Sequence, residues 1–230
     1  MSFSSDVKAE LAEAYSSARH CQIAEIAAML SMDGQIFEDI RGGRTVVLRT
    51  ENLAVARKYF TLLKKTFNIE ADILIRRSVV QQKSRSYHLY VTGADDADRI
   101  INAARMSPLE EPGQWIPGRL ILQNDCCRRA FLRGAYLAAG SMSNPEKGYH
   151  FEIACAVKEK AEQLGEVLST FGIEGRIILR KKYHVLYVKE GDQIADILNL
   201  ISAHVALMKL ENIRILKEMR ETVNRQVNCE

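Results

Sequence analysis

The chain has 230 residues with 32 basic and 29 acidic side chains, which gives a formal net charge of +3. Hydrophobic residues make up 47% and charged residues 27%, a composition that is typical of a globular protein and excludes extensive disorder. No run of about 18 apolar residues occurs, and the first residues lack the basic and apolar regions of a signal peptide. We therefore expect a cytoplasmic protein with no membrane partner.

The first half and the second half of the chain resemble each other in sequence. Residues 67–77 parallel residues 171–181, and Pro108, Pro112 and Pro117 lie between the halves. Proline neither continues a helix nor donates to a sheet ladder, so this stretch is typical of a linker. We expect two copies of one domain-sized unit, with these boundaries: 1–106 for the first unit, 107–123 for the proline-rich linker, 124–203 for the second unit and 204–230 for a connecting helix.

Each unit is predicted to run helix, strand, helix, strand, strand, helix, with apolar residues at helical spacing in the helices and β-branched residues in the strands. Both parallel crossovers and hairpins are expected, which places the fold in the mixed α+β class. Gly34 and Gly140 are expected to end the opening helices in the left-handed conformation. The expected elements are opening helices at 22–32 and 126–139, strands at 45–49 and 149–154, helices at 53–67 and 158–171, hairpins at 71–77 with 87–92 and at 176–181 with 184–188, and closing helices at 97–104 and 193–202.

The two opening helices carry small side chains about four residues apart, which allows close approach of helix axes. Each helix could pack on its own sheet, or the two could pack on each other at a pseudo-twofold axis; the duplication favours the second arrangement. The residues that would form this interface are Ala24, Ala27, Ala28, Ser31, Gly134, Ala135 and Ala138.

Basic residues gather on the two predicted hairpins, where they would contact DNA phosphates or form an ordinary solvated surface; both interpretations remain open. Strand alternation predicts one face with Arg176, Arg180, Lys182 and His184, and an inward face with Ile177 and Leu179. The candidate DNA-binding residues are Arg76, Arg77, Lys83, Arg85, Arg176, Arg180, Lys181 and Lys182.

The five cysteines are odd in number and none shows the CxxC spacing. This pattern favours a reducing compartment and argues against a disulfide framework or a zinc site. The sequence therefore predicts no metal and no cofactor, and the cysteines are interpreted as small buried hydrophobic residues: Cys21, Cys126, Cys127, Cys155 and Cys229.

Two segments, residues 26–34 (IAAMLSMDG) and 132–140 (LRGAYLAAG), resemble the LAGLIDADG motif of homing endonucleases. In that family, two such helices pack together above a saddle of β-strands that binds DNA. A closer resemblance, to the bacterial WhiA family, extends along the whole chain. It rests on residues 1–11 (MSFSSDVKAEL), 129–141 (RAFLRGAYLAAGS), 144–150 (NPEKGYH), 210–220 (LENIRILKEMR) and 223–230 (VNRQVNCE).

The resemblance implies a duplicated LAGLIDADG-like fold with pseudo-twofold symmetry and no catalysis. A nuclease of this type holds divalent metal with one acid from each motif, just before the final glycine. This chain has Asp33 at the first position and Ala139 at the second, so half of the acid pair is missing. We interpret Asp33 as structural or vestigial.

The WhiA resemblance further implies a nucleoid-associated regulator of sporulation, cell division or chromosome segregation that acts on double-stranded DNA. We expect a monomer, because the duplication supplies an internal pseudodimer. In that family a helix-turn-helix domain follows the duplicated body and is the main DNA reader. We expect it to be missing here, because the chain stops at Glu230. A sigma factor or RNA polymerase is a further partner implied by the family. The alternatives are a metal-dependent endonuclease and a protein-interaction scaffold without DNA contact.

Overall fold

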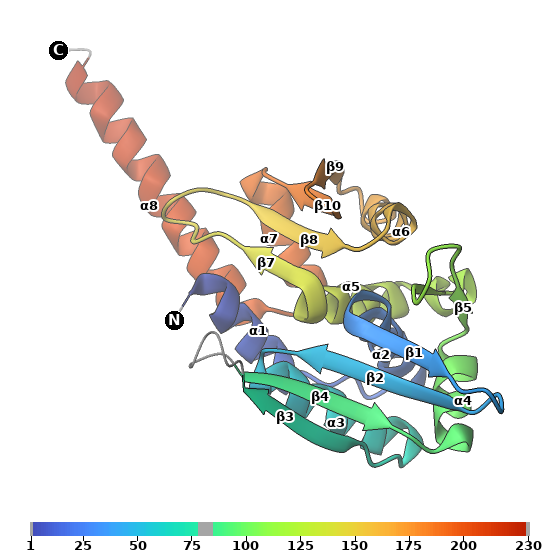
Figure 1. The fold of residues 1–230 in the computed structure, drawn as a ribbon. Coiled ribbons are helices and arrows are strands. Elements are labelled where there is room, and N and C mark those ends of the chain that lie inside the picture. Colours follow the sequence, from blue (N-terminus) through green and yellow to red (C-terminus); the bar gives the residue numbers. More distant parts are fainter. Residues whose placement is uncertain (1, 78–84, 229–230) are drawn as a thin grey trace.

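The computed structural model describes residues 2–77 and 85–228, and side chains up to residue 222. Two similar units are stacked one above the other, each with a sheet on one side and helices behind it (Figure 1). The first unit comprises α1 (Phe3–Glu13), α2 (Arg19–Asp33), β1 (Gly34–Glu38), β2 (Arg44–Thr50), α3 (Leu53–Phe67), β3 (Asp72–Arg77), β4 (Arg85–Val91) and α4 (Ala94–Ala103). The second comprises α5 (Asp125–Ala139), β7 (Gly140–Met142), β8 (Phe151–Cys155), α6 (Lys158–Ser169), β9 (Arg176–Arg180), β10 (Tyr183–Val188) and α7 (Gly191–Leu200). The α+β class is confirmed.

Both units contain a four-stranded sheet with the same order of strands, β1-β2-β4-β3 and β7-β8-β10-β9. Every pair of neighbouring strands in the described part of the chain is antiparallel. Each unit still contains the expected parallel crossover, because β2 and β3 are both antiparallel to β4 and therefore run in the same direction, as β8 and β9 do beside β10. The chain leaves β2, crosses through α3 and enters β3 in the same direction as β2, and β4 then returns between these two strands in the opposite direction. The hairpins β3–β4 and β9–β10 are confirmed.

The predicted helix at 53–67 is confirmed residue for residue, because both of its ends are marked in the sequence. Asn52 accepts hydrogen bonds from the backbone N–H groups of Ala54 and Val55, and Asn68 ends the helix in the left-handed conformation (φ 56°). Its apolar stripe packs on the core. Less strongly marked elements shift by a few residues, so that α2 starts at Arg19 and α6 ends at Ser169.

The short strands β1 and β7 were not predicted. They show that the expected left-handed conformation of Gly34 and Gly140 is wrong. Gly34 and Gly140 are extended, with φ values of −85° and −82°, and each starts a strand directly where a helix ends. Glycine is required for space instead, because a Cβ would overlap the backbone of Leu30 in one unit and both the ring and the Cα of Tyr136 in the other. A chain that turns from helix to strand without a loop leaves no turn signal in the sequence.

The segment between the units is more ordered than a simple linker. Strands β5 (Met106–Pro108) and β6 (Trp115–Pro117) form a two-stranded ribbon, and the 3₁₀ helix η1 (Arg119–Leu122) follows it. Pro108 and Pro117 lie at the ends of these strands, where a missing N–H is tolerated, and Pro112 lies in the turn between them. Trp115 is half-buried against the core, and its carbonyl accepts a hydrogen bond from the Ser31 hydroxyl of α2.

The helix α8 (His204–Asn228) starts on the body and then projects away from it (Figure 1). The carboxylate of Glu10 in α1 accepts hydrogen bonds from the backbone N–H groups of Val205 and Ala206, at 2.8 and 3.0 Å. Ala206 and Leu210 are buried, so this helix is anchored through its first two turns. Among the described residues, no helix is long and apolar enough to cross a membrane.

The helices α2 and α5 pack directly on each other at the centre of the molecule, between the two sheets (Figure 1). Gly134 of α5 lies against the backbone of Glu25, and a Cβ at Gly134 would lie only 3.0 Å from the Cβ of Ala28. Ala24, Ala27 and Ala135 are completely buried. The remaining small residues of the predicted interface are buried (Ser31) or half-buried at the end of α5 (Ala138).

A buried cluster of charges fastens α1 and α3 to this central pair. The carboxylate of Glu25 lies 2.8 Å from Lys58 Nζ and accepts two hydrogen bonds from the Arg133 guanidinium, at 2.9 and 2.8 Å. Lys58 also donates to the carbonyl of Leu11, at 2.7 Å. Burial lowers the pKa of Lys58, and Glu25 opposes that shift. Because all three charged groups are removed from water, the loss of any one of them would leave an uncompensated charge in the core.

Replacement of Gly134 by alanine is expected to lower the free energy of unfolding by about 1–3 kcal/mol, because the new methyl group would separate α2 from α5. The matched control is Gly165→Ala in α6, where the methyl group would lie at ordinary contact distance, 3.8 Å from Leu186. Alanine should stabilise that helix by about 0.5–1 kcal/mol. Urea unfolding of both variants tests this; destabilisation by the same amount would contradict the close contact.

The variant Glu25→Gln is expected to lose about 3–5 kcal/mol of stability, because it leaves Lys58 and Arg133 as uncompensated buried cations. Glu70 forms a 2.6 Å ion pair with Lys64 on the surface, so Glu70→Gln is the matched control and should leave the unfolding midpoint almost unchanged. Equal midpoints for the two variants in thermal unfolding would show that the buried cluster does not hold the helices.

Candidate nucleic-acid interface

Each sheet turns one face toward the helices and leaves the other open, and in the first sheet the open face carries two arginines and one acid, Asp72. Leu48 and Leu89 are paired and buried against the helices, so the neighbouring pair of Arg49 and His88 projects to the opposite side. Arg76 is two residues beyond the partner of His88 on β3 and shares this face. Arg49 and Arg76 are exposed, and neither forms an ion pair within the described part of the chain.

The pKa of His88 is sensitive to the positive charges on this face. Its ring stacks on Tyr90, with 6.3 Å between the ring centroids, and its Nε2 lies 3.1 Å from the Ser86 hydroxyl. Burial and the positive charges of Arg76 and Arg49 lower the pKa of His88. The histidine is therefore neutral near pH 7, while the two guanidinium groups beside it form a positive surface suited to phosphate.

The open face of the second sheet carries Arg180, but this arginine is already engaged. Its guanidinium donates two hydrogen bonds to the Glu152 carboxylate, both at 2.9 Å, and His150 Nε2 lies 2.9 Å from the same carboxylate. Arg180 is the main cause that lowers the pKa of Glu152 to about 2. Because a bidentate carboxylate neutralises it, Arg180 is a weaker phosphate ligand than the sequence predicted.

The predicted alternation along this hairpin is wrong at its turn. Lys181 and Lys182 form a two-residue turn, with Lys181 at φ 57°, so the register pairs Arg180 with Tyr183 and Leu179 with His184. His184 therefore lies on the face opposite to Arg180. Leu179 is 67% exposed rather than inward, because it lies near the end of the edge strand β9, whereas Ile177 is half-buried against the core.

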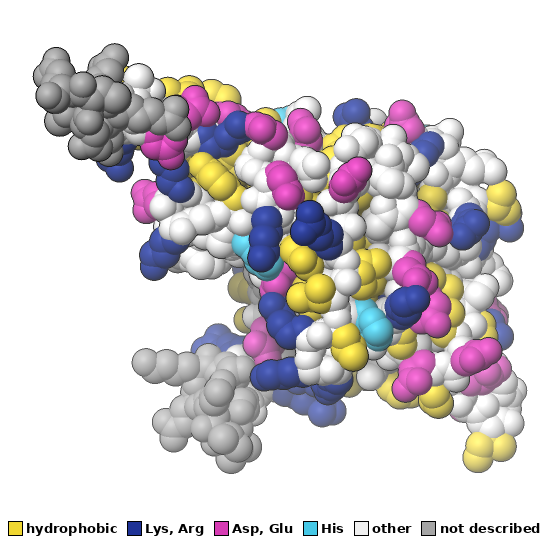
Figure 2. Space-filling model, turned by 90° about the horizontal axis from the view of Figure 1, so that it is seen from above, with side chains coloured by type: hydrophobic (Ala, Val, Ile, Leu, Met, Phe, Trp, Pro, Cys, Tyr) yellow, Lys and Arg dark blue, Asp and Glu magenta, His cyan; other side chains and the backbone are white. Residues whose placement is uncertain are grey.

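The remaining basic candidates do not lie on one common surface. Arg77 and Arg85 pair directly and share the side of the sheet opposite to Arg76. Arg176 pairs with Tyr187 on the open face of the second sheet. Within the described part of the chain, none of these three arginines forms an ion pair. Lys83 lies outside the described residues. Figure 2 shows one side of the molecule on which Lys and Arg side chains gather toward the left of the view, with hydrophobic and histidine side chains between them.

A cleft of about 600 Å³ lies where the two units meet, at the C-terminal ends of α2 and α5. Arg49 and Asp33 line it from the first unit, and Ala138 and Tyr183 from the second. Lys8 of α1 also lines it. Ala139, the last residue of α5, takes the place that Asp33 takes in α2. The cleft therefore has one carboxylate where a paired metal site would have two.

Cations surround this single carboxylate. Burial raises the pKa of Asp33 to about 6, while Lys8, Lys160 and Arg49 act in the opposite direction. Lys160 donates hydrogen bonds to the Ser31 carbonyl and, at 2.6 Å, to Gln114 Oε1, and burial lowers its pKa to about 8.

The sequence did not identify these three cations as part of the site. Arg49 was detectable as a polar residue alternating with Leu48 and Thr50, whereas Lys8 and Lys160 carry no spacing signal.

Two family models match the chain: the "WhiA N-terminal LAGLIDADG-like domain" at residues 19–106 and the "WhiA LAGLIDADG-like domain" at residues 128–220. A probable cell division protein WhiA from Lachnoclostridium phytofermentans is 50% identical over 232 residues, covering all of this chain and 74% of the relative. The chain belongs to the WhiA family. A WhiA relative from Thermoanaerobacter, also called a probable cell division protein, is 40% identical, and the match covers 73% of its length.

Solved structures show the WhiA fold. Full-length WhiA from Thermotoga maritima matches with a TM-score of 0.69 at 20% identity, over 99% of this chain and 75% of that one. The homing endonuclease I-DmoI, solved with DNA and manganese, matches with a TM-score of 0.58 at 17% identity, over 80% of this chain and 98% of that one. The duplicated LAGLIDADG-like fold is therefore confirmed.

The raised pKa of Asp33 predicts how the stability of the protein changes with pH. Its folded pKa of about 6 lies above the ordinary value of 3.8, so between those pH values the folded protein binds more protons than the unfolded chain. Stability must then fall as pH rises from about 4 to 6 and stay lowered above that range. Asp33→Asn removes this loss, so the variant should gain on the order of 2 kcal/mol over the wild type across this window. Urea unfolding at pH 4, 5, 6 and 7 measures it; a constant difference between the two proteins would contradict the assignment.

Proposed function

We propose that this WhiA protein is a non-catalytic DNA-binding regulator of transcription, whose LAGLIDADG-like body contacts the DNA backbone. The observation that carries this proposal is the positive open face formed by Arg49 and Arg76 around a neutral His88. Guanidinium groups at the surface of a sheet are suited to phosphate oxygens. The same fold holds DNA in the I-DmoI complex, which supports the choice of ligand.

The central cleft argues against a nuclease. A divalent metal at scissile phosphates needs several oxygen ligands, and the second helix supplies Ala139 instead of an acid. The remaining carboxylate, Asp33, faces the cations Lys8, Lys160 and Arg49. These cations neutralise Asp33 and repel a divalent metal. These cations would instead favour a phosphate group in the cleft. The loss of the second acid removes a metal ligand and also leaves the cleft less negative, which favours phosphate binding.

Contacts to phosphate provide affinity and register but little sequence information. We therefore assign sequence reading to a helix-turn-helix outside this chain, as the family resemblance implies; the chain covers 74% of its relative from Lachnoclostridium. The relatives' names support a role in cell division. A role in sporulation or chromosome segregation, association with the nucleoid and a sigma factor or RNA polymerase as partner rest on the resemblance.

A second candidate function, a protein-interaction scaffold, is favoured by the surface of α8. Along its length, including the two turns that are anchored on the body, this helix exposes several large apolar side chains, which a partner helix or domain could cover. They are Val205, Met208, Ile215, Leu216 and Met219, with exposed fractions between 53% and 73%. The two functions are compatible, because α8 projects from the body while the basic face lies on the first sheet (Figure 1).

Fluorescence anisotropy with labelled duplex DNA across a salt series tests the proposed function. Affinity should fall steeply with salt, and Arg49→Ala and Arg76→Ala should each reduce the slope of log K against log salt by about 0.9, because each removes one phosphate contact. Arg180→Ala should have a smaller effect, because Glu152 already holds this side chain.

The matched control is Arg57→Ala on α3, an exposed arginine of a helix on the other side of the first sheet. This variant should bind as the wild type does. Absence of binding at low salt would favour the scaffold, and cleavage of supercoiled plasmid with magnesium or manganese would establish the endonuclease.

A further inference from the structure

Four side chains that can bind a transition metal meet where α2 and α5 begin. His20 and Cys21 are the second and third residues of α2, and Cys126 and Cys127 are the second and third residues of α5. The offset between the two pairs is the same 106 residues that relates the two LAGLIDADG-like segments. The two helices thus contribute equivalent positions, at the opposite end of the helix pair from Asp33 and Ala139.

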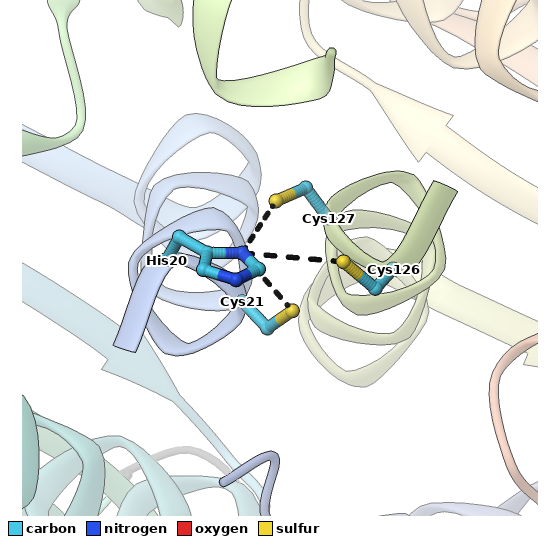
Figure 3. A group of neighbouring side chains, drawn as sticks. All are labelled: His20, Cys21, Cys126 and Cys127. Carbon is cyan, nitrogen blue, oxygen red and sulfur yellow. Dashed lines mark hydrogen bonds between the residues drawn. The ribbon is translucent and has the colours of Figure 1, made fainter. Parts of the chain in front are cut away.

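The side chains point toward one another across the helix interface. Figure 3 shows the imidazole of His20 facing all three sulfur atoms, two of them from the other helix. His20 Nδ1 lies 3.1 Å from Cys127 Sγ, 3.4 Å from Cys21 Sγ and 4.0 Å from Cys126 Sγ. All four candidate ligand atoms lie within 4.8 Å of one another.

These separations fit a tetrahedral metal. Zinc bound by thiolates at about 2.3 Å and by imidazole at about 2.0–2.1 Å brings neighbouring ligand atoms to about 3.6–3.8 Å. The separations from His20 Nδ1 fall on both sides of that range, so small rotations of side chains would complete the geometry. Three thiolates with one imidazole are a ligand set that selects zinc over hard cations such as magnesium.

Burial in the core does not explain the arrangement. Cys21 and Cys127 are buried, but Cys126 and His20 are exposed, and both still point at the buried sulfurs. The thiols of Cys21, Cys126 and Cys127 would bind a metal as thiolates. A bound divalent cation would deprotonate these thiols, and the positive ends of two helix dipoles would help to balance the resulting thiolate charge.

We propose that His20, Cys21, Cys126 and Cys127 form a structural zinc site that clamps the N-terminal ends of α2 and α5. Four protein ligands close the coordination shell, so the site has no open position for catalysis. Its exposed side, at His20 and Cys126, gives the ion a path from solvent. The absence of CxxC spacing does not oppose this site, because the fold brings together two adjacent pairs from different units.

Metal analysis of the purified, reduced, untagged chain is the first test. Equimolar zinc is expected by mass spectrometry of the metal content. Substitution by cobalt should give a thiolate-to-cobalt charge-transfer band and the visible bands of tetrahedral cobalt. Chelation should lower the melting temperature of the wild type.

The decisive variants are Cys126→Ser and His20→Gln, because both residues are exposed and can be replaced without a core cavity. Each should lose bound metal and weaken the cobalt bands. Cys155→Ser is the matched control: Cys155 is a buried cysteine beside Met32, at the other end of α2, and its loss should leave metal content unchanged.

Three results would overturn the proposal: no metal and no cobalt bands in the reduced wild type, full metal retention by Cys126→Ser and His20→Gln together, or equal loss in Cys155→Ser. In the metal-free case, peptide mapping of the oxidised chain for a Cys21–Cys127 disulfide would identify a redox link between the helices instead. None of these readouts requires DNA binding.

Discussion

The close packing of α2 on α5 is the contact on which the other features of the molecule depend. Glycine at position 134 lets the helix backbones approach, and the buried carboxylate of Glu25 then holds cations from α3 and α5. This contact sets the two sheets side by side and brings the C-terminal ends of both helices into one cleft. The basic face, the cleft and the cysteine cluster are all placed by the same pair of helices.

Equivalent positions in the two units have diverged in chemistry while the backbone has kept its symmetry. Asp33 corresponds to Ala139, and the basic open face of the first sheet corresponds to a second sheet in which Glu152 neutralises Arg180. At the other end of the helices, His20 corresponds to Cys126. A nuclease requires two equivalent acids, whereas a protein that binds backbone phosphates tolerates such asymmetry. The divergence therefore agrees with binding without cleavage.

Features that depend on neighbouring residues in the sequence, such as the ends of a helix, could be predicted. The helix at 53–67 was predicted correctly because Asn52 and Asn68 mark its ends, and the duplication revealed the two units. The position of β4 between β2 and β3 and the short strands β1 and β7 were not predicted, because tertiary contacts determine them. Lys8, Lys160 and the His–Cys cluster were missed for the same reason: their partners lie more than 20 residues away in the sequence. Arg180 lies on the predicted hairpin, but the sequence does not show that the Glu152 carboxylate already binds its guanidinium.

Hydrogen–deuterium exchange with and without duplex DNA tests the central claim, DNA contact by the body, most directly. The account predicts slower exchange in peptides that cover β2, β3 and β4, around Arg49 and Arg76, and unchanged exchange in α3 and α6 behind the sheets. Protection confined to α8, or no protection in either sheet at a DNA concentration that saturates binding, would contradict it.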